Sequence, residues 1–424
     1  MKKTKTKVKA LRGTRDLLPK EAKLWTILEN EAKRIFNLFG YEEIRTPIME
    51  ETPLFVRSIG EGTDIVEKQM YTFLDRGGRP VALRPEATAS AVRAYLEHGM
   101  DKLGGLVKLF YIGPMFRAER PQAGRARQFH QIGVEAIGSY SPYLDAEIID
   151  LLSKILDSFS VKDYSIKLNS LGCDNDKKEL SIGLRKSIES QITNFCDDCK
   201  ARYKKNALRI LDCKNEKCQK YIRAIFKGTN DYLCPKCRSH FDSVKDALAI
   251  LKVDYKLEPY LVRGLDYYTK TTFEVTHQKL GAQDAIAAGG RYDNLVSDFG
   301  GPEKGACGFA MGIERTITAS KEVPLINSGI DIYLATIGEA AYRLGFKLAM
   351  ELRNSGIAAE MDYEDKSLKA QMRAADKLGA RFVGLIGDDE IKGNTVTLRD
   401  MKTKEQRAIS QSVLISEIRK ALSK

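Results

Sequence analysis

The spacing of hydrophobic residues predicts a chain that begins with a helix and continues into short strands. Apolar positions recur every three or four residues over 21–38 and stop at Gly40, which predicts a helix that ends there. Residues 41–49 are then expected to form a strand closed by a proline. Helix spacing returns over 87–97 and again over 145–159.

Strand patterns are more frequent than helix patterns in this first part of the chain. An Asp-Arg-Gly-Gly run at 75–78 lies between two short apolar runs and predicts a β-hairpin. The predicted strands are 71–74, 80–83, 109–111, 129–136, 260–262 and 270–276. Clustered strands with few helices indicate an antiparallel sheet and an α+β domain, because a doubly wound sheet needs a helix after nearly every strand.

The pattern changes beyond Gly329, where strands and helices alternate. The predicted strands are 331–337, 358–363, 381–386 and 395–399, and the predicted helices are 340–354, 367–378 and 413–422. Such alternation indicates a separate α/β domain, 329–424. Residues 160–252 mix helix patterns with basic residues and cysteines, and we interpret them as an insertion that divides the first domain into 1–159 and 253–325.

Composition and charge narrow the class of protein. A chain of 424 residues is too long for one ordinary domain, and it contains no apolar run long enough to cross a bilayer. The lysine-rich start, 1–9, lacks the apolar core of a secretory signal, so we expect a cytoplasmic protein with no membrane partner. A formal net charge of +12 favours polyanionic partners such as nucleic acid, although solvated lysine faces are common in other proteins.

The cysteines predict a structural metal site. Eight cysteines in a chain without an export signal argue against disulfides, because cytosolic thiols stay reduced. Two Cys-x2-Cys pairs have the spacing of zinc ligands, and they predict a Zn²⁺ site formed by Cys196, Cys199, Cys234 and Cys237. Two further cysteines are alternative ligands or small core residues: Cys213 and Cys218. The remaining Cys173 and Cys307 are expected in the core.

Arginines and carboxylates gather at the predicted strand ends. Arg117, Arg263 and Arg315 occupy three such positions, and the neighbouring carboxylates are Glu86, Glu119 and Glu135. An isolated Arg-x-Glu at a hairpin tip is ordinarily a solvated pair. Three arginines without a catalytic triad, however, indicate a clamp for a phosphate chain, where positioning and charge stabilisation do the catalysis. The chain has no Gly-x4-Gly-Lys-Ser/Thr loop, so a nucleotide must be bound in another way.

Several short stretches together resemble the class II aminoacyl-tRNA synthetases. Residues 40–49 are similar to the first motif of this class, which lies at the dimer interface, although a plain helix-to-strand turn would look the same. Residues 116–119 through Phe129 are similar to the second motif, and 308–315 are similar to the third. Each motif is short, and their order along nearly the whole chain gives the resemblance its specificity.

Within this class the chain resembles the histidyl-tRNA synthetase family. The stretches that carry this resemblance are Arg-Gly-Thr-Arg-Asp-Leu-Leu-Pro at 12–19, Leu-Val-Arg-Gly-Leu-Asp-Tyr-Tyr-Thr at 261–269 and Ala-Gly-Gly-Arg-Tyr-Asp at 288–293. One departure is Ala87, where the family usually has glycine, and we expect its methyl group to tighten the pocket wall.

The resemblance implies a histidine–tRNA ligase. It implies that L-histidine and ATP with Mg²⁺ give histidyl-adenylate, and that the histidyl group passes to the 3′ end of tRNA(His). It also implies a homodimer, a C-terminal anticodon-binding domain and no editing domain. We expect the basic insertion to reach the acceptor arm of the tRNA.

The resemblance also assigns roles to individual residues. Arg117 and Arg263 are the expected catalytic residues, on the α-phosphate. The expected ATP-binding residues are Arg117, Glu119 at the adenine amino group, Phe129 on the ring and Arg315 at the γ-phosphate. The expected histidine-binding residues are Glu86, Ala87, Thr88, Arg117, Gln131, Glu135, Arg263, Tyr267 and Tyr268. Taken alone, the tyrosines would be core aromatics and the polar residues ordinary members of a strand face.

Three other functions remain open from the residues. A regulatory relative from histidine biosynthesis would keep the catalytic fold as a histidine sensor, but the C-terminal domain and the three arginines argue against it. A nucleic-acid-binding zinc protein built on this scaffold would not need the ATP-side residues. An enzyme that adenylates another substrate is disfavoured by the Tyr267–Tyr268 stretch. Histidine-dependent exchange of pyrophosphate into ATP would separate these functions.

Overall fold

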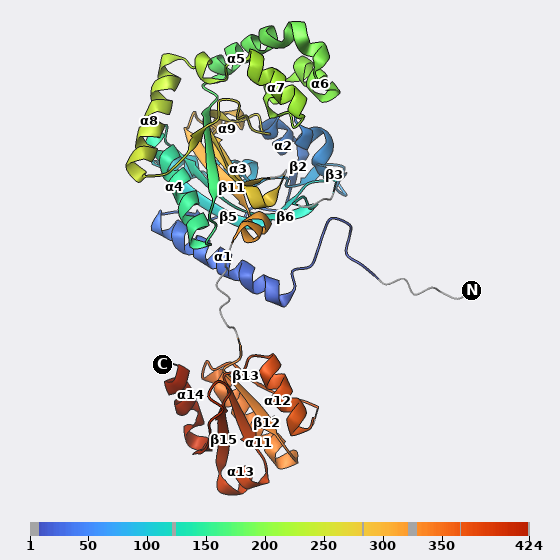
Figure 1. Cartoon of the computed structure of the whole chain (residues 1–424), viewed down its shortest axis with the longest axis vertical. Coiled ribbons are helices and arrows are strands. Elements are labelled where there is room, and N and C mark those ends of the chain that lie inside the picture. The colour runs from blue at the N-terminus through green and yellow to red at the C-terminus, as the bar shows by residue number, and fades with distance from the viewer. Residues whose placement is uncertain (1–7, 121–123, 282–283, 321–328, 365, 423–424) are drawn as a thin grey trace, which may run out of the picture. The chain divides into compact units, whose positions relative to one another are not determined.

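The computed structural model describes residues 8–120, 124–281, 284–320, 329–364 and 366–422. Most of the predicted basic tail, 1–7, lies outside these residues. The chain forms two compact units, Met1–Val323 and Pro324–Lys424 (Figure 1). No helix within the described ranges is long and apolar enough to cross a membrane.

An eight-stranded sheet is the centre of the first unit. Its order is β1-β5-β6-β11-β10-β9-β7-β8. The strands are β1 (Glu42–Glu43), β5 (Val107–Phe116), β6 (Gln128–Ile137), β7 (Tyr164–Ser170), β8 (Lys256–Leu257), β9 (Thr269–His277), β10 (Ala285–Arg291) and β11 (Ala306–Gly312). The α+β class is confirmed, but the sheet is mixed rather than wholly antiparallel, because β1–β5 and β7–β8 pair in parallel. Long connections that contain helices join each of these pairs, as parallel pairing requires.

Three long helices share the hydrophobic core of this sheet: α1 (Pro19–Leu38), α4 (Pro142–Ser158) and α8 (Pro235–Leu251). On β6 the even-numbered residues Ile132, Val134 and Ala136 belong to this core. Because strand side chains alternate between faces, the odd-numbered residues of β6 face the other side of the sheet. That opposite face is where a site can form.

A smaller three-stranded sheet, ordered β2-β4-β3, lies next to the main one. The predicted hairpin is confirmed as β3 (Tyr71–Leu74) and β4 (Pro80–Leu83). The Asp75 carboxylate accepts hydrogen bonds from the backbone N–H groups of Gly77 and Arg79, which fixes the turn. The predicted strand over 41–49 is wrong in its middle, because only Glu42–Glu43 and β2 (Met49–Glu51) are strands. The remaining helices here are α2 (Thr52–Ile59), α3 (Thr88–Glu97), α9 (Leu295–Asp298) and α10 (Ile313–Ala319).

A group of helices leaves the main sheet after β7. It comprises α5 (Asp174–Ile188), α6 (Asp197–Lys205) and α7 (Glu216–Ile225) (Figure 1, green). These helices and the turn Ala207–Asp212 share a second hydrophobic core with α3, α9 and the ends of β6 and β11. We call these three helices and their connections, residues 174–225, the α5–α7 segment. This segment is shorter than the predicted insertion, 160–252, because β7 belongs to the main sheet and α8 packs in the core of that sheet. The predicted strand at 260–262 is also wrong, because Leu261 accepts a side-chain hydrogen bond from Asn169 at 2.8 Å instead of joining a ladder.

The second unit has a five-stranded sheet ordered β13-β12-β14-β15-β16. Its strands are β12 (Ile332–Thr336), β13 (Ala359–Met361), β14 (Phe382–Ile386), β15 (Thr395–Asp400) and β16 (Gln406–Ser410), and its helices are α11 (Glu339–Asn354), α12 (Leu368–Lys377), α13 (Asp388–Gly393) and α14 (Leu414–Leu422). The alternating pattern predicted all of these elements except α13 and β16, which are short or mostly exposed.

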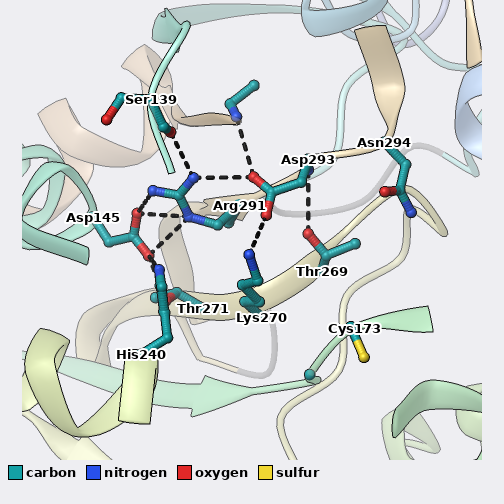
Figure 2. A network of polar contacts seen from close by, with 12 residues as sticks. Ser139, Asp145, Cys173, His240, Thr269, Lys270, Thr271, Arg291, Asp293 and Asn294 are labelled. Atoms are coloured by element: carbon teal, nitrogen blue, oxygen red, sulfur yellow. Dashed lines mark hydrogen bonds and ion pairs between the residues drawn. The ribbon is translucent and has the colours of Figure 1, made fainter. Parts of the chain in front are cut away.

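A buried arginine joins the end of β10 to α4 (Figure 2). The Arg291 side chain is fully buried and forms ion pairs with Asp145 and Asp293. Its remaining N–H groups donate to the backbone carbonyls of Ser139 and Ser141 at 2.8 and 2.9 Å. A buried charge is tolerated only when it is paired and hydrogen-bonded, and every guanidinium nitrogen of Arg291 meets this condition.

We predict that Arg291→Ala lowers the free energy of unfolding of the first unit by about 3–5 kcal/mol, because the change removes the arginine partner of buried Asp145 and leaves Lys270 as the remaining ion-pair partner of Asp293. The only tryptophan of the chain, Trp25, lies in this unit. Urea denaturation of the full chain followed by tryptophan fluorescence therefore reports on this unit. Arg34→Ala is the control, since that arginine is exposed and pairs with Glu31 on the surface. Equal losses in both variants would contradict the assignment.

Candidate active site

A cavity of about 490 Å³ lies over the face of the main sheet that the long helices leave free. The predicted residues that line it are Glu86, Thr88, Arg117, Glu119, Phe129, Gln131, Glu135, Arg263, Tyr267, Tyr268 and Arg315. Three of them, Phe129, Gln131 and Glu135, are odd-numbered positions of β6, as the alternation requires. The structure thus brings together residues that are far apart in the sequence.

Ala87 is the one predicted histidine-binding residue that does not line the cavity. Its side chain is buried in a small cluster with Tyr111 and Met115, behind the wall. The tightening of the pocket wall by its methyl group stays a prediction, because the same cluster includes Phe129, which lines the cavity.

Glu135 is a fully buried carboxylate at the inner end of the cavity. Its Oε1 atom accepts hydrogen bonds from the hydroxyl groups of Thr88, at 2.8 Å, and Tyr111, at 3.2 Å. The Tyr292 hydroxyl donates to Oε2. Burial raises the pKa of Glu135 to about 8, because hydroxyl groups compensate the desolvation of a carboxylate only in part. Tyr111 is accommodated because the opposite residue is Gly133, where a Cβ atom would lie 2.4 Å from the tyrosine ring.

Glu86 is a second buried carboxylate, at the N-terminus of α3. Its two oxygens accept from the backbone N–H groups of Thr88 and Ala89 at 2.6 and 3.0 Å. Helix N-termini favour anions, but burial raises the pKa of Glu86 above its ordinary value. The inner end of the cavity therefore holds two acceptor groups that are poorly solvated.

Two polar atoms near these carboxylates lack partners. Among the residues that the structure describes, the buried Oε1 atom of Gln131 and the buried Nε atom of Arg263 have no hydrogen bond. Buried polar groups are normally satisfied, so such atoms inside a cavity indicate that a ligand completes them. The ring centroids of Tyr267 and Tyr268, which also line the cavity, are 4.7 Å apart.

The other end of the cavity is rich in arginine. Arg117 donates through Nε to the carbonyl of Pro85 at 3.0 Å, and its guanidinium lies over the Phe129 ring. Arg315 donates to the carbonyls of Ala285 and Gly124 at 2.6 and 3.0 Å. Burial lowers the pKa of both arginines, because each charge has little solvent around it, and an anionic ligand would compensate this loss of solvation.

Arg263 is held between the two ends by an ion pair with Glu274 on β9. Burial opposes its charge, but Glu274 raises the pKa of Arg263 above its ordinary value. The backbone carbonyl of Arg263 accepts from Arg209 of the α5–α7 segment at 2.9 Å.

Several partners of the predicted residues escaped the sequence reasoning. They are Tyr111 and Tyr292 at Glu135, Glu274 at Arg263, and Arg125, which pairs with Glu119 at 3.0 Å. Tyr292 lies in the Gly-Gly-Arg-Tyr-Asp stretch and could have been found there. Glu274 looks like any polar residue of a strand, so the sequence carries no signal for it.

The cysteines lie outside the cavity and form two groups. Cys196 and Cys199 gather with Cys213 and Cys218, whereas Cys234 and Cys237 gather with Cys173 and Asp176. The predicted four-cysteine site is therefore divided, because α6 and α7 lie in the α5–α7 segment while α8 packs against α4. Cys173 is also not a plain core residue, whereas Cys307 is buried in the core of the main sheet.

The mixed sheet, the arginine-lined cavity and the separate C-terminal unit define a class II aminoacyl-tRNA synthetase. The family model for histidyl-tRNA synthetase matches residues 13–316, and the anticodon binding domain model matches residues 331–421. The chain belongs to the histidyl-tRNA synthetase family, and its activity is that of a histidine–tRNA ligase.

Relatives of known identity match over nearly the full length. A histidine–tRNA ligase of Halothermothrix orenii is 52% identical and covers 97% of this chain and 99% of its own. One from Clostridioides difficile is 44% identical, with coverage of 98% and 99%. The crystal structure of apo histidyl-tRNA synthetase from S. aureus has a TM-score of 0.82 at 37% identity, covering 97% of this chain and all of that chain.

Glu135 predicts a pH dependence of stability. Its folded-state pKa of about 8 lies above the ordinary value of 4.5, so between these values the folded state binds more protons than the unfolded state. The free energy of unfolding of the ligand-free protein should therefore fall as pH rises through this interval. We expect Glu135→Gln to be less sensitive to pH and more stable than the unaltered protein at about pH 8. Urea denaturation at several pH values measures both slopes, and identical slopes would contradict the assignment.

Proposed function

We propose that this cavity joins L-histidine to ATP through Arg117 and Arg263 and that the histidyl group then passes to the 3′ end of tRNA(His). The observation that carries the proposal is the convergence of three arginines and two buried carboxylates on one cavity. Guanidinium groups suit phosphate, while the carboxylates offer acceptors to the amino and imidazole N–H groups of histidine. Both substrates would then meet in one space.

Adenylate formation brings two anions together. The histidine carboxylate attacks the α-phosphate of ATP, and the repulsion between them is the main barrier that positioned cations can lower. Arg117 would bridge the carboxylate and the phosphate, and Arg263 would bind the α-phosphate from the opposite side. Glu274 and the Pro85 carbonyl hold these two guanidinium groups in place before the substrates arrive.

At the arginine-rich end of the cavity, ATP would be bound by Glu119, Phe129 and Arg315. Glu119 would accept from the adenine amino group, Phe129 would stack on the ring, and Arg315 would bind the γ-phosphate. Glu314, another carboxylate that lines the cavity, would hold Mg²⁺ together with the phosphates of ATP. When bound with ATP, Mg²⁺ neutralises phosphate charge.

The histidine end would be read by Glu86, Thr88, Gln131, Glu135, Tyr267 and Tyr268. The unsatisfied Oε1 atom of Gln131 and the two buried carboxylates would accept from the N–H groups of the substrate. A site that hydrogen-bonds its substrate can reject analogues without those groups by about 10⁴–10⁵-fold, which removes the need for editing.

Other parts of the chain would bind tRNA, form the dimer interface and bind structural zinc. The C-terminal unit would bind the anticodon, and basic residues of the α5–α7 segment would meet the acceptor arm. Dimerisation would use the three-stranded sheet, which exposes Ile48, Met49, Phe73 and Leu74. Structural zinc would bind to Cys196, Cys199, Cys213 and Cys218. We place the enzyme in the cytoplasm, where thiols stay reduced.

The central prediction is histidine-dependent exchange of pyrophosphate into ATP by the purified full chain. Exchange should be strong with histidine and near background with each of the other amino acids, because the polar inner end selects for the imidazole. Exchange without amino acid preference, or no exchange with any, would refute the proposed function.

Arg263→His should lower the rate of adenylate formation by about 10²-fold or more while histidine affinity changes much less, because Arg263 would act on the charge that develops in the transition state. Single-turnover kinetics separates the two quantities. Arg34→His is the matched control, since that exposed arginine pairs with Glu31 on α1 and does not line the cavity. Equal losses of rate and affinity would assign Arg263 to ground-state binding instead.

A further inference from the structure

Cys173, Asp176, Cys234 and Cys237 form a second group of metal-ligating side chains, whose two halves flank the first group along the chain. One ligand atom from each of the four lies within 4.8 Å of each of the others. Four zinc ligands at the corners of a tetrahedron are about 3–4 Å apart, since Zn–S bonds are about 2.3 Å and Zn–O bonds about 2.0–2.2 Å. Small side-chain shifts would therefore suffice for coordination.

The four residues occupy matching positions on two helix N-termini. Cys173 is the N-cap of α5 and Asp176 lies three residues later, while Cys234 is the N-cap of α8 and Cys237 lies three residues later. Side chains at these two positions lie on the same side of the first turn. Two helix ends that face each other thus present four ligands to one point, and both helix dipoles favour anionic ligands there.

Asp176 is the centre of this group. Its carboxylate accepts from the backbone N–H groups of Cys173 and Cys234, at 3.2 and 3.1 Å, so it already joins the two helix N-caps. A carboxylate has about four lone-pair positions, and two remain for a metal. Gly172 adopts a φ of +70°, and a Cβ atom there would lie 2.3 Å from the Asp176 carboxylate, so the chain approaches this side chain as closely as glycine permits.

We infer that these four residues bind a second structural Zn²⁺ ion, separate from the one proposed at Cys196, Cys199, Cys213 and Cys218. Three thiolates and one carboxylate are ligands that zinc accepts in a closed tetrahedral site. The ion closes the base of the α5–α7 segment, because it joins the first turn of α5 to the first turn of α8, which packs in the core of the main sheet.

The site also supports the predicted histidine-binding loop. Lys177, the residue after Asp176, donates through Nζ to the backbone carbonyls of Asp266 and Tyr268, at 3.2 and 3.1 Å. The backbone N–H of Lys270 donates to the Gly172 carbonyl at 2.7 Å. Figure 2 shows Cys173 near this part of the chain and outside the Arg291 network. Fixing the first turn of α5 therefore fixes two carbonyl contacts of the loop that carries Tyr267 and Tyr268.

The test is the zinc content of the full chain, expressed with added zinc and purified without chelator, by elemental mass spectrometry. We expect two zinc ions per chain, one in Asp176→Asn and one in Cys213→Ser. Cys307→Ala, a buried cysteine outside both groups, should keep two. The second site would be overturned if the unaltered protein bound one zinc ion and Cys213→Ser bound none. It would also be overturned if the unaltered protein bound no zinc.

Asp176→Cys distinguishes a metal ligand from a simple helix cap. A fourth thiolate should retain both ions and slow the release of one of them to a chelator by about tenfold or more, because zinc binds thiolate more tightly than carboxylate. A capping role alone predicts no slower release, and that result would overturn the site even if Asp176→Asn fails to fold. This inference does not rest on the proposed function, since zinc content is measured without catalysis.

Lys177→Met tests the connection to the histidine loop. It should raise the KM for histidine more than the KM for ATP while the zinc content stays at two. An unchanged histidine KM would overturn the supporting role of α5 but would leave the zinc content to decide the metal site.

Discussion

The cost of burying charge is the constraint on which the first unit depends. Arg291 at the end of β10 and Asp145 on α4 form an ion pair, and both side chains are almost completely buried. Burial of such groups is tolerated only with partners, and these are the carbonyls of Ser139 and Ser141 and the carboxylate of Asp293. The paired charges of Arg291, Asp145 and Asp293 thus fix the position of β10 relative to α4.

In the cavity, by contrast, buried polar groups are not fully compensated by the protein, and this leaves them available to bind a ligand. Burial raises the pKa of Glu135, and the hydroxyl groups around it offset this rise only in part. Gln131 Oε1 and Arg263 Nε lack partners among the described residues. A folded protein tolerates such deficits where a ligand later removes them, whereas elsewhere they are selected against. Beside α4, every guanidinium nitrogen of Arg291 is paired, whereas in the cavity Gln131 and Arg263 each keep a polar atom for a ligand.

Sequence reasoning succeeded where the signal is local or where separate motifs share one chemistry. The turn at Asp75 is determined by its own carboxylate, and the three arginines were related because all of them suit phosphate. It failed where the outcome depends on which helix ends meet. Equal Cys-x2-Cys spacing suggested one zinc site, but only the packing of α8 on α4 shows that Cys234 joins Cys173 instead of Cys196. No sequence pattern reports that choice.

The α5–α7 segment supports the loop at 263–268, a structural role that its basic composition does not predict. Asn206 donates to the Asp266 side chain at 3.2 Å, Arg209 donates to the Arg263 carbonyl at 2.9 Å, and Lys177 reaches two more carbonyls of the same loop. These four hydrogen bonds come from α5 and from the turn at 206–209, and they converge on residues 263–268. Since that loop presents Arg263, Tyr267 and Tyr268 to the cavity, a change in the packing of the segment must alter the geometry of the cavity. An interaction of tRNA with this segment would therefore act on the same loop that holds the amino acid.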